Sequence, residues 1–210
     1  MKLHIGFDID GTCTMFHKYA IDKAKHLFDL NIPDDVKTMN YFDFSQVSLG
    51  KMSNQEFWDT YRDKYYAACI NGEYLDPGFE YAMKALHDSE HEFSFITNRA
   101  AHVPVSSFKE NRTIVYTEQF LDNRAPGYSY VVFNRMDSKV PFVKNLHLDI
   151  YVEDEVKNII QISEHVPVIV PRRPYNQNIY GGRKCRIYYV DDLSHIPETI
   201  EQIRKDGHLR

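Results

Sequence analysis

Residues 3–12 read LHIGFDIDGT, an apolar run that ends in two aspartates and a glycine. A short apolar run bounded by acids predicts a buried strand, here from Leu3 to Ile9. Asp8 and Asp10 leave this strand toward the same side, because alternate residues of a strand face alike. Gly11 permits a tight turn. The two carboxylates are therefore expected together, just beyond the end of the strand.

Five further strands are expected along the chain, separated by helical patterns. The strands are expected at residues 92–96, 128–133, 149–152, 166–170 and, at an edge of the sheet, 186–190. Helical patterns cover residues 77–87, 139–146, 155–162 and 196–203. This alternation predicts an α/β fold, with a Rossmann-like, mostly parallel sheet and helices on both faces.

Residues 14–75 break the alternation, because they contain helical patterns only, such as 19–30 and 54–66, around an aromatic loop at 40–44. We expect them to form a small helical cap inserted after the first strand. The core domain would then comprise residues 1–13 and 76–210. Four aromatic residues of the cap are candidates for stacking on a substrate: Tyr41, Phe42, Phe57 and Trp58. The alternative for each is a place in the cap's own core.

Polar residues follow four of the expected strands. Asp8 and Asp10 follow the first strand, and the run Thr97-Asn98-Arg99 follows the second. Later in the chain come Lys139 and the pair Glu153-Asp154. Ligands of an open parallel sheet bind at the carboxyl ends of its strands, so we expect these groups to surround one site. Asn98 and Arg99 are candidates for binding the substrate there.

Paired carboxylates repel each other unless a cation or a shared proton lies between them. A hard cation with oxygen ligands, Mg²⁺, suits such a pair, and we expect Asp8 and an acid of the Glu153-Asp154 pair to hold it. A calcium loop of the EF-hand type is the alternative for an Asp-x-Asp-Gly run. It fails because no glutamate stands at the twelfth position counted from Asp8.

The remaining residues fit phosphoryl transfer. Asp8 can attack phosphorus to form an acyl phosphate, and Asp10 can protonate the leaving oxygen and later deprotonate water. Lys139 can offset negative charge and hold a phosphate oxygen, and the hydroxyl of Thr97 can hold another. Each residue alone has an ordinary structural explanation, such as a helix cap or a solvated lysine. Their order, with each group at a strand end, favours the chemical one.

The run FDIDGT at residues 7–12 resembles motif I of the haloacid-dehalogenase superfamily, and FITN at 95–98 resembles motif II. Lys139 matches motif III, and residues 153–154 match the acidic motif IV. The resemblance spans nearly the whole chain. It implies a Mg²⁺-dependent phosphatase with Asp8 as nucleophile, because the second aspartate of motif I accompanies phosphoryl transfer in this superfamily. It also implies that the backbone carbonyl of Asp10 contacts the metal.

A closer likeness is to the 5'(3')-deoxyribonucleotidases and the bacterial nucleotidases grouped with them. It rests on the insert after motif I and on four short runs, at residues 41–44, 56–58, 152–154 and 174–176. It implies hydrolysis of a nucleoside monophosphate. Many members have two aspartates at motif IV where this chain has Glu153 first, so we favour Asp154 as the direct metal ligand and Glu153 second. The alternatives are a phosphatase for a sugar phosphate or other small metabolite, and an inactive binding protein with this fold.

Composition excludes several other classes of protein. The 210-residue chain has a formal net charge of −5 and three widely separated cysteines. These features predict no nucleic-acid track, no zinc site and a reducing, cytoplasmic location. No apolar run reaches the length of a membrane span. The chain has one short basic patch, for which we favour a solvated face over a binding site. Its members are Arg172, Arg173, Arg183, Lys184 and Arg186.

Overall fold

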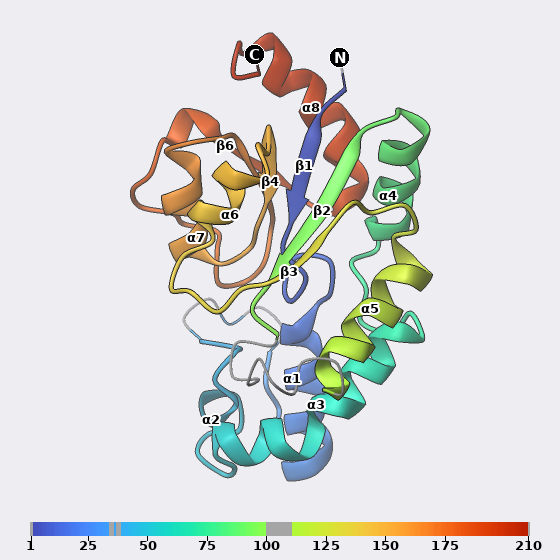
Figure 1. The fold of residues 1–210 in the computed structure, drawn as a ribbon. Coiled ribbons are helices and arrows are strands. Elements are labelled where there is room, and N and C mark those ends of the chain that lie inside the picture. Colours follow the sequence, from blue (N-terminus) through green and yellow to red (C-terminus); the bar gives the residue numbers. More distant parts are fainter. Residues whose placement is uncertain (1, 34–35, 37–38, 100–110, 210) are drawn as a thin grey trace.

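The computed structural model describes residues 2–33, 36, 39–99 and 111–209. Within these residues, six strands form a single sheet in the order β3-β2-β1-β4-β5-β6, and every neighbouring pair is parallel (Figure 1). The strands are β1 (His4–Phe7), β2 (Glu92–Thr97), β3 (Val131–Phe133), β4 (Ile150–Val152), β5 (Val168–Pro171) and β6 (Ile187–Val190). The expected α/β fold with a parallel sheet is confirmed.

Helices cover both faces of the sheet (Figure 1). On one face, α4 (Phe79–Asp88) and α8 (Ile196–Lys205) pack on the sheet, and Phe79 and Ile200 belong to the same buried cluster as Phe7 of β1. On the other face lie α6 (Val140–Asn145) and α7 (Val156–Ser163), which bury Val143 and Ile159 in a second cluster. The amphipathic spacing of each helix explains this placement, because one apolar stripe per helix needs a partner.

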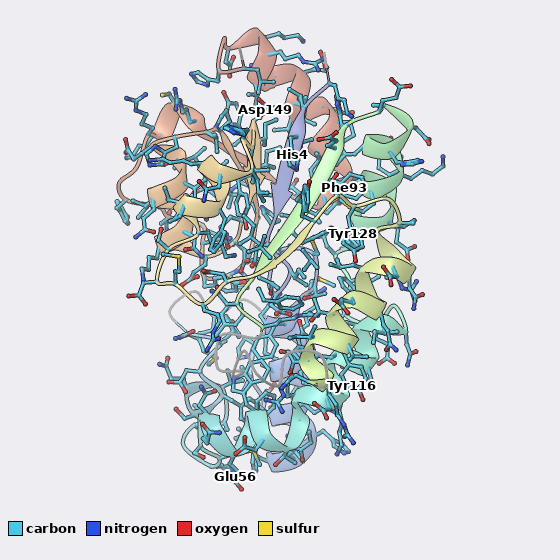
Figure 2. All side chains as sticks on the ribbon, viewed as in Figure 1. His4, Glu56, Phe93, Tyr116, Tyr128 and Asp149 are labelled. Atoms are coloured by element: carbon cyan, nitrogen blue, oxygen red, sulfur yellow. The ribbon has the colours of Figure 1, made fainter. Side chains whose placement is uncertain are left out.

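Four helices of the described chain lie between β1 and β2. The first three form the insert: α1 (Phe16–Phe28), α2 (Phe44–Val47) and α3 (Asn54–Ile70). They lie beyond the carboxyl ends of the strands, in the lower part of Figure 1. Figure 2 shows Glu56 of α3 at the opposite end of the molecule from His4 and Asp149, which lie at the amino ends of their strands. The chain enters and leaves this insert side by side, because the Met15 amide donates to the Tyr74 carbonyl at 2.6 Å.

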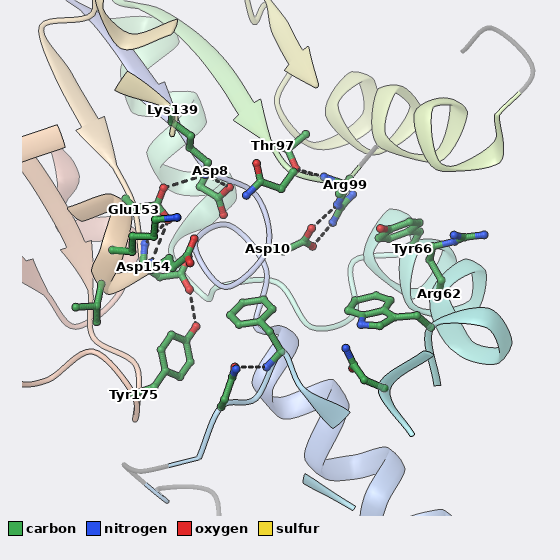
Figure 3. A pocket seen from close by; sticks show the side chains of 18 of the residues that line it. Asp8, Asp10, Arg62, Tyr66, Thr97, Arg99, Lys139, Glu153, Asp154 and Tyr175 are labelled. Carbon is green, nitrogen blue, oxygen red and sulfur yellow. Dashed lines mark hydrogen bonds and ion pairs between the residues drawn. The ribbon is translucent and has the colours of Figure 1, made fainter. Parts of the chain in front are cut away.

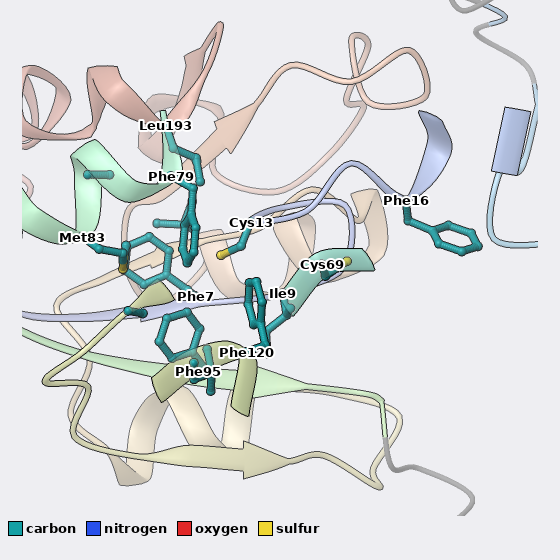
Figure 4. Close-up of a cluster of buried hydrophobic side chains, with 14 of the residues drawn as sticks. Phe7, Ile9, Cys13, Phe16, Cys69, Phe79, Met83, Phe95, Phe120 and Leu193 are labelled. Carbon is teal, nitrogen blue, oxygen red and sulfur yellow. The ribbon is translucent and has the colours of Figure 1, made fainter. Parts of the chain in front are cut away.

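The interior of the insert is continuous with the core beneath the sheet. Phe7, Phe79 and Phe120 are fully buried, and the same cluster continues through Cys69 to Phe16 in the insert (Figure 4). Aromatic rings therefore fill the junction between the sheet and the helices of the insert. No helix in the described part of the chain is both long enough and apolar enough to span a lipid bilayer.

The structure contains one long helix that the sequence did not predict. It is α5 (Arg112–Arg124), which packs against α3 of the insert. Asn111 caps it by accepting from the amide of Thr113 at 2.9 Å. Ile114, Phe120 and Leu121 are buried, but polar residues separate them, so the apolar period is weak in sequence. Its burial depends on contact with α3, which no local pattern shows.

Candidate active site

A pocket of about 970 Å³ opens between the sheet and the insert. Ten of the residues expected at the site line it (Figure 3): Asp8, Asp10, Thr97, Asn98, Arg99, Lys139, Glu153, Asp154, Phe42 and Trp58. They come from the ends of β1, β2 and β4, from the start of α6 and from the insert. The parallel sheet explains this gathering, because all its strands end at the same edge.

Asp8 is the first residue after β1. Its amide donates to the Val152 carbonyl at 3.0 Å, so the end of β4 fixes its backbone. The ammonium group of Lys139 donates both to Asp8 and, at 2.9 Å, to the carboxylate of Glu153. Burial by itself would lower the pKa of Lys139, but Asp8 and Glu153 outweigh this effect and raise the pKa well above its ordinary value. Lys139 is therefore charged.

Asp8, Glu153 and Asp154 form a buried acidic triad, with one carboxylate oxygen of each within 4.8 Å of the others. Burial raises the pKa of Asp8 to about 8 and the pKa of both Glu153 and Asp154 to about 7. One lysine cannot neutralise three carboxylates. A divalent cation fits this donor set, because it supplies the missing charge and prefers oxygen ligands.

The two acids after β4 have different partners. One oxygen of Glu153 faces Lys139, and the other accepts from the amides of Asp154 and Glu155, each at 3.1 Å, at the start of α7. Asp154 instead accepts two hydroxyl groups, from Thr12 at 2.7 Å and from Tyr175 at 2.5 Å. Glu153 is therefore engaged by Lys139 and by the amides at the start of α7. Among the described residues, the Asp154 carboxylate accepts only from neutral hydroxyl groups.

Asp10 is held by residues from β2 and from the insert. Arg99 donates to its two oxygens at 2.8 and 2.6 Å, and the hydroxyl of Tyr65 donates to it at 2.9 Å. The Arg99 side chain is fully buried, and its guanidinium carbon lies 4.5 Å from the centre of the Tyr66 ring. Arg99 was expected to bind substrate. In the structure Arg99 lines the pocket, and its guanidinium group forms a bidentate ion pair with Asp10.

Thr97 and Asn98 lie at the end of β2, next to Arg99. Thr97 is buried, and its hydroxyl oxygen accepts from the Arg99 amide at 3.2 Å. Asn98 is exposed toward the pocket and its side-chain oxygen accepts from Asn134, which follows β3, at 2.8 Å. Hydrogen bonds between neighbouring strand ends therefore fix this polar edge.

The four aromatic candidates divide into two pairs. Phe42 and Trp58 line the pocket, and their rings stack on Phe16 with centroid distances of 5.2 and 4.9 Å. Tyr41 and Phe57 are buried and do not belong to the pocket wall. Phe57 packs on Phe44 at a centroid distance of 3.7 Å, and the Tyr41 hydroxyl donates to the Val36 carbonyl. The geometry places Tyr41 and Phe57 in the core of the insert.

Several residues of the site were not singled out from the sequence. Tyr65, Tyr66 and Arg62 reach it from α3, a connection that strand-end reasoning does not consider. Tyr175 belongs to the run at residues 174–176 that resembles the nucleotidases, but the sequence alone indicates no role for it. The interpretation of the basic patch as a solvated face was wrong for Arg173, which is 4% exposed and donates to the Gly11 carbonyl at 2.6 Å.

The acidic triad predicts how stability depends on pH when no metal is bound. A carboxyl group whose pKa is raised on folding binds more protons in the folded state than in the unfolded state, so stability falls as pH rises through the folded pKa. With folded pKa values of about 7 to 8, the melting temperature in excess chelator should fall between about pH 6 and about pH 8.

Thermal melts across this pH range test the expectation. Asp154→Asn removes one ionisable member of the triad and should make the fall shallower. A metal-free protein whose melting temperature stayed constant or rose over this range would contradict the assigned shifts.

No family model matches this chain. It is 28% identical over 177 residues to a Bacillus subtilis protein named "Putative nucleotidase YqfW", with 83% of each chain covered. It is 24% identical over 205 residues to a Clostridium acetobutylicum protein named a nucleotidase, with 95% of each covered. Among solved structures, a haloacid dehalogenase-like hydrolase from Streptococcus pneumoniae superposes with a TM-score of 0.58 at 13% identity, covering 95% of this chain and 98% of the other.

These findings agree on the architecture. The chain has a haloacid-dehalogenase-like fold, with helices inserted between β1 and β2, and it resembles distant relatives named as nucleotidases over most of its length. The likeness to solved structures bears on the fold alone.

Proposed function

We propose that this protein is a Mg²⁺-dependent phosphomonoesterase that hydrolyses a nucleoside monophosphate through an aspartyl phosphate on Asp8. The observation that supports it most directly is the shared pocket, in which the acidic triad with Lys139 faces the aromatic rings of Phe42 and Trp58. One wall suits a phosphate and a metal ion, and the other suits a flat base. A pocket of this size is within the range that holds small ligands.

Asp8 is the proposed nucleophile. A carboxylate oxygen of Asp8 attacks phosphorus, the bond from phosphorus to the ester oxygen breaks, and Asp10 gives the departing oxygen its proton. Asp10 then removes a proton from water, which attacks the aspartyl phosphate, releases inorganic phosphate and regenerates Asp8. Lys139, already beside Asp8, stabilises charge on the transferring group, and the Thr97 hydroxyl can donate to one of its oxygens.

Asp8 and Asp154 are the proposed side-chain ligands of Mg²⁺, with the backbone carbonyl of Asp10 as a further ligand and Glu153 as second choice among the acids. The bound ion would supply positive charge that favours entry of a phosphate dianion. Asn98 remains a proposed substrate contact because it is exposed to the pocket. Arg99 is proposed to hold Asp10 in place for its two proton transfers.

Residues 14–75 are the proposed cap, on a core of residues 1–13 and 76–210. Support comes from the paired entry and exit of the chain, where the Asp76 amide donates to the Cys13 carbonyl at 2.9 Å. A cap above the site can shield the phosphorylated aspartate from stray water and contact the leaving group. Its contacts would then decide which ester is hydrolysed.

A substrate panel tests the proposed function. Phosphate release would be measured from ribo- and deoxyribonucleoside monophosphates, sugar phosphates and p-nitrophenyl phosphate, each with and without Mg²⁺. We expect the highest kcat/KM for a nucleotide and no turnover without the metal. A preference for sugar phosphates would favour the small-metabolite phosphatase instead, and no turnover of any ester with Mg²⁺ would favour a binding protein.

Substitution of the pocket aromatics should alter selectivity more than chemistry. Phe42→Ala and Trp58→Ala each remove a ring from the pocket wall, and stacking on a base is worth about 1–3 kcal/mol. We expect kcat/KM for the preferred nucleotide to fall about 5- to 150-fold. Turnover of p-nitrophenyl phosphate should change much less, because this small ester makes few contacts with the insert. Steady-state kinetics on both substrates measure the difference.

Phe57 provides a matched control, since it is an aromatic neighbour of Trp58 that is fully buried. Phe57→Leu should lower the melting temperature and reduce activity on both substrates alike, as a packing defect does. Equal losses on both substrates in Phe42→Ala and Trp58→Ala, in proteins that remain folded, would rule out base stacking.

A further inference from the structure

Residues 173–176, which follow β5, anchor the loop of motif I at residues 8–12 through hydrogen bonds. Arg173 is buried and donates to two backbone carbonyls of that loop, those of Gly11 at 2.6 Å and Thr12 at 2.9 Å. Its charge is balanced by Asp76, which directly follows the insert and accepts from Arg173 at 2.8 Å. The turn that presents Asp8 is thus anchored to a segment far away in sequence.

The same segment also holds the loop after β4. Asn176 is fully buried, and its amide group donates to the backbone carbonyls of Asp154 and Pro171, each at 3.0 Å. Its side-chain oxygen accepts from the Arg173 amide at 2.9 Å. Residues 173–176 therefore connect the backbones on both sides of the acidic triad.

Tyr175 lies between these two anchors and reaches the triad itself. Its hydroxyl donates to Oδ2 of Asp154 at 2.5 Å (Figure 3). The Thr12 hydroxyl donates to Oδ1 of the same carboxylate. The Tyr175 hydroxyl is the donor in its hydrogen bond, because an ionised carboxylate can only accept. An ionised carboxylate offers about four lone-pair sites, and two hydroxyl groups leave room for a cation on the same side chain.

The contact between Gly11, Asp154 and Tyr175 leaves no space for a side chain at Gly11. A Cβ atom at Gly11 would lie 2.0 Å from Oδ2 of Asp154 and 2.7 Å from the Tyr175 hydroxyl oxygen. Gly11 also has a φ of +91°, which side chains rarely adopt. The glycine of motif I thus allows the loop, the acid and the tyrosine to come into contact.

The ring of Tyr175 contacts the insert as well. Its centroid lies 5.7 Å from that of Tyr41 and 6.0 Å from that of Phe42, in the loop before α2. Tyr175 lines the same pocket as Phe42. A single side chain therefore contacts a carboxylate of the triad through its hydroxyl and the aromatic wall of the pocket through its ring.

We propose that Tyr175 is a positioning residue that holds Asp154 in place for the metal ion and, through its ring, supports the aromatic wall against which the substrate packs. This inference rests on the proposed function for the identity of the metal site. Without the Tyr175 hydroxyl, Asp154 keeps only the hydrogen bond from Thr12 and its side chain gains freedom, which is lost again whenever a cation binds. Residues that orient metal ligands typically change metal affinity about 10- to 100-fold when they are replaced.

Calorimetric titration with MgCl₂ alone, in the absence of any substrate, tests the role of the hydroxyl. Tyr175→Phe keeps the ring and should weaken Mg²⁺ binding about 10- to 100-fold relative to wild type. Tyr188→Phe is the matched control, because it removes a tyrosine hydroxyl that donates to Asp206 at 2.9 Å, outside the pocket. It should leave the affinity unchanged.

Kinetics at saturating Mg²⁺ separate the ring from the hydroxyl. Tyr175→Phe should then recover most of its kcat and keep a KM for the nucleotide near the wild-type value. Tyr175→Leu removes the ring too and should raise KM at the same metal concentration. A KM for Tyr175→Leu equal to that of Tyr175→Phe would overturn the role of the ring.

The outcomes also distinguish this inference from the proposed function. If wild type binds Mg²⁺ and Tyr175→Phe binds it equally well, the positioning role is wrong while the metal site stands. If wild type does not bind Mg²⁺, the proposed metal site is wrong and the inference falls with it. Melting curves establish that each variant is folded before it is titrated.

Discussion

Asp8→Asn is expected to abolish turnover of every phosphate ester, with kcat reduced on the order of 10⁴- to 10⁶-fold. Asparagine has nearly the same shape as aspartate, but its amide is a poor nucleophile and cannot form the acyl phosphate. The substitution removes one charge from the buried triad and leaves Lys139 paired with Glu153, so the variant should remain folded. Steady-state phosphate release measures kcat, and thermal melts measure the stability of the variant.

Asp10→Asn is the matched comparison, because it alters an aspartate two residues away that is not proposed to attack phosphorus. It should slow turnover less, on the order of 10²- to 10⁴-fold, by removing both proton transfers. With p-nitrophenyl phosphate, whose leaving group needs little protonation, phosphorylated Asp8 should accumulate in Asp10→Asn and be visible by mass spectrometry. Near wild-type turnover by Asp8→Asn would falsify the covalent mechanism.

Removal of Mg²⁺ is expected to reduce activity to background, and its return should restore activity fully. In the metal-free site, Asp8, Glu153 and Asp154 lie within 4.8 Å of one another with Lys139 as the cation beside them. An entering phosphate dianion would meet this excess of negative charge. The charge of a bound divalent ion removes the repulsion and stabilises the transferring group.

The metal should also stabilise the fold, because it binds the assembled triad and not the unfolded chain. At a concentration one hundred times its dissociation constant, a ligand adds about 2.7 kcal/mol to the free energy of unfolding. Melting temperature measured against MgCl₂ concentration therefore provides a second readout that needs no substrate. Retention of full activity in excess chelator would be incompatible with the proposed metal site.

A pair of variants identifies the acid that contacts the ion. Asp154→Asn should weaken Mg²⁺ binding more than Glu153→Gln, because Glu153 is already engaged with Lys139 and with two amides at the start of α7. Each substitution preserves side-chain size while removing one charge. The opposite order of affinities would assign the direct contact to Glu153.

The sequence was sufficient to predict the fold class and the edge of the sheet where the pocket lies. Asp8 directly follows the apolar strand β1 and Glu153 directly follows β4, while β2 ends at the polar residue Thr97. Local hydrophobic patterns determine such strands, and the rules for parallel sheets place their ends together. The sequence alone could therefore predict that residues from separate parts of the chain, such as Asp8 and Glu153, lie in one pocket.

Tertiary packing decided the features that depend on side chains from distant segments. The role of Arg99 as a partner of Asp10, the burial of Phe57 and the contact between Tyr175 and Asp154 have no local signature. The same is true of α5, whose apolar face is covered by α3. Hydrophobic periodicity indicates which face of an element is buried, but not which element covers it. Whether an aromatic or charged side chain serves the site or the core depends on that partner, and only the folded structure specifies it.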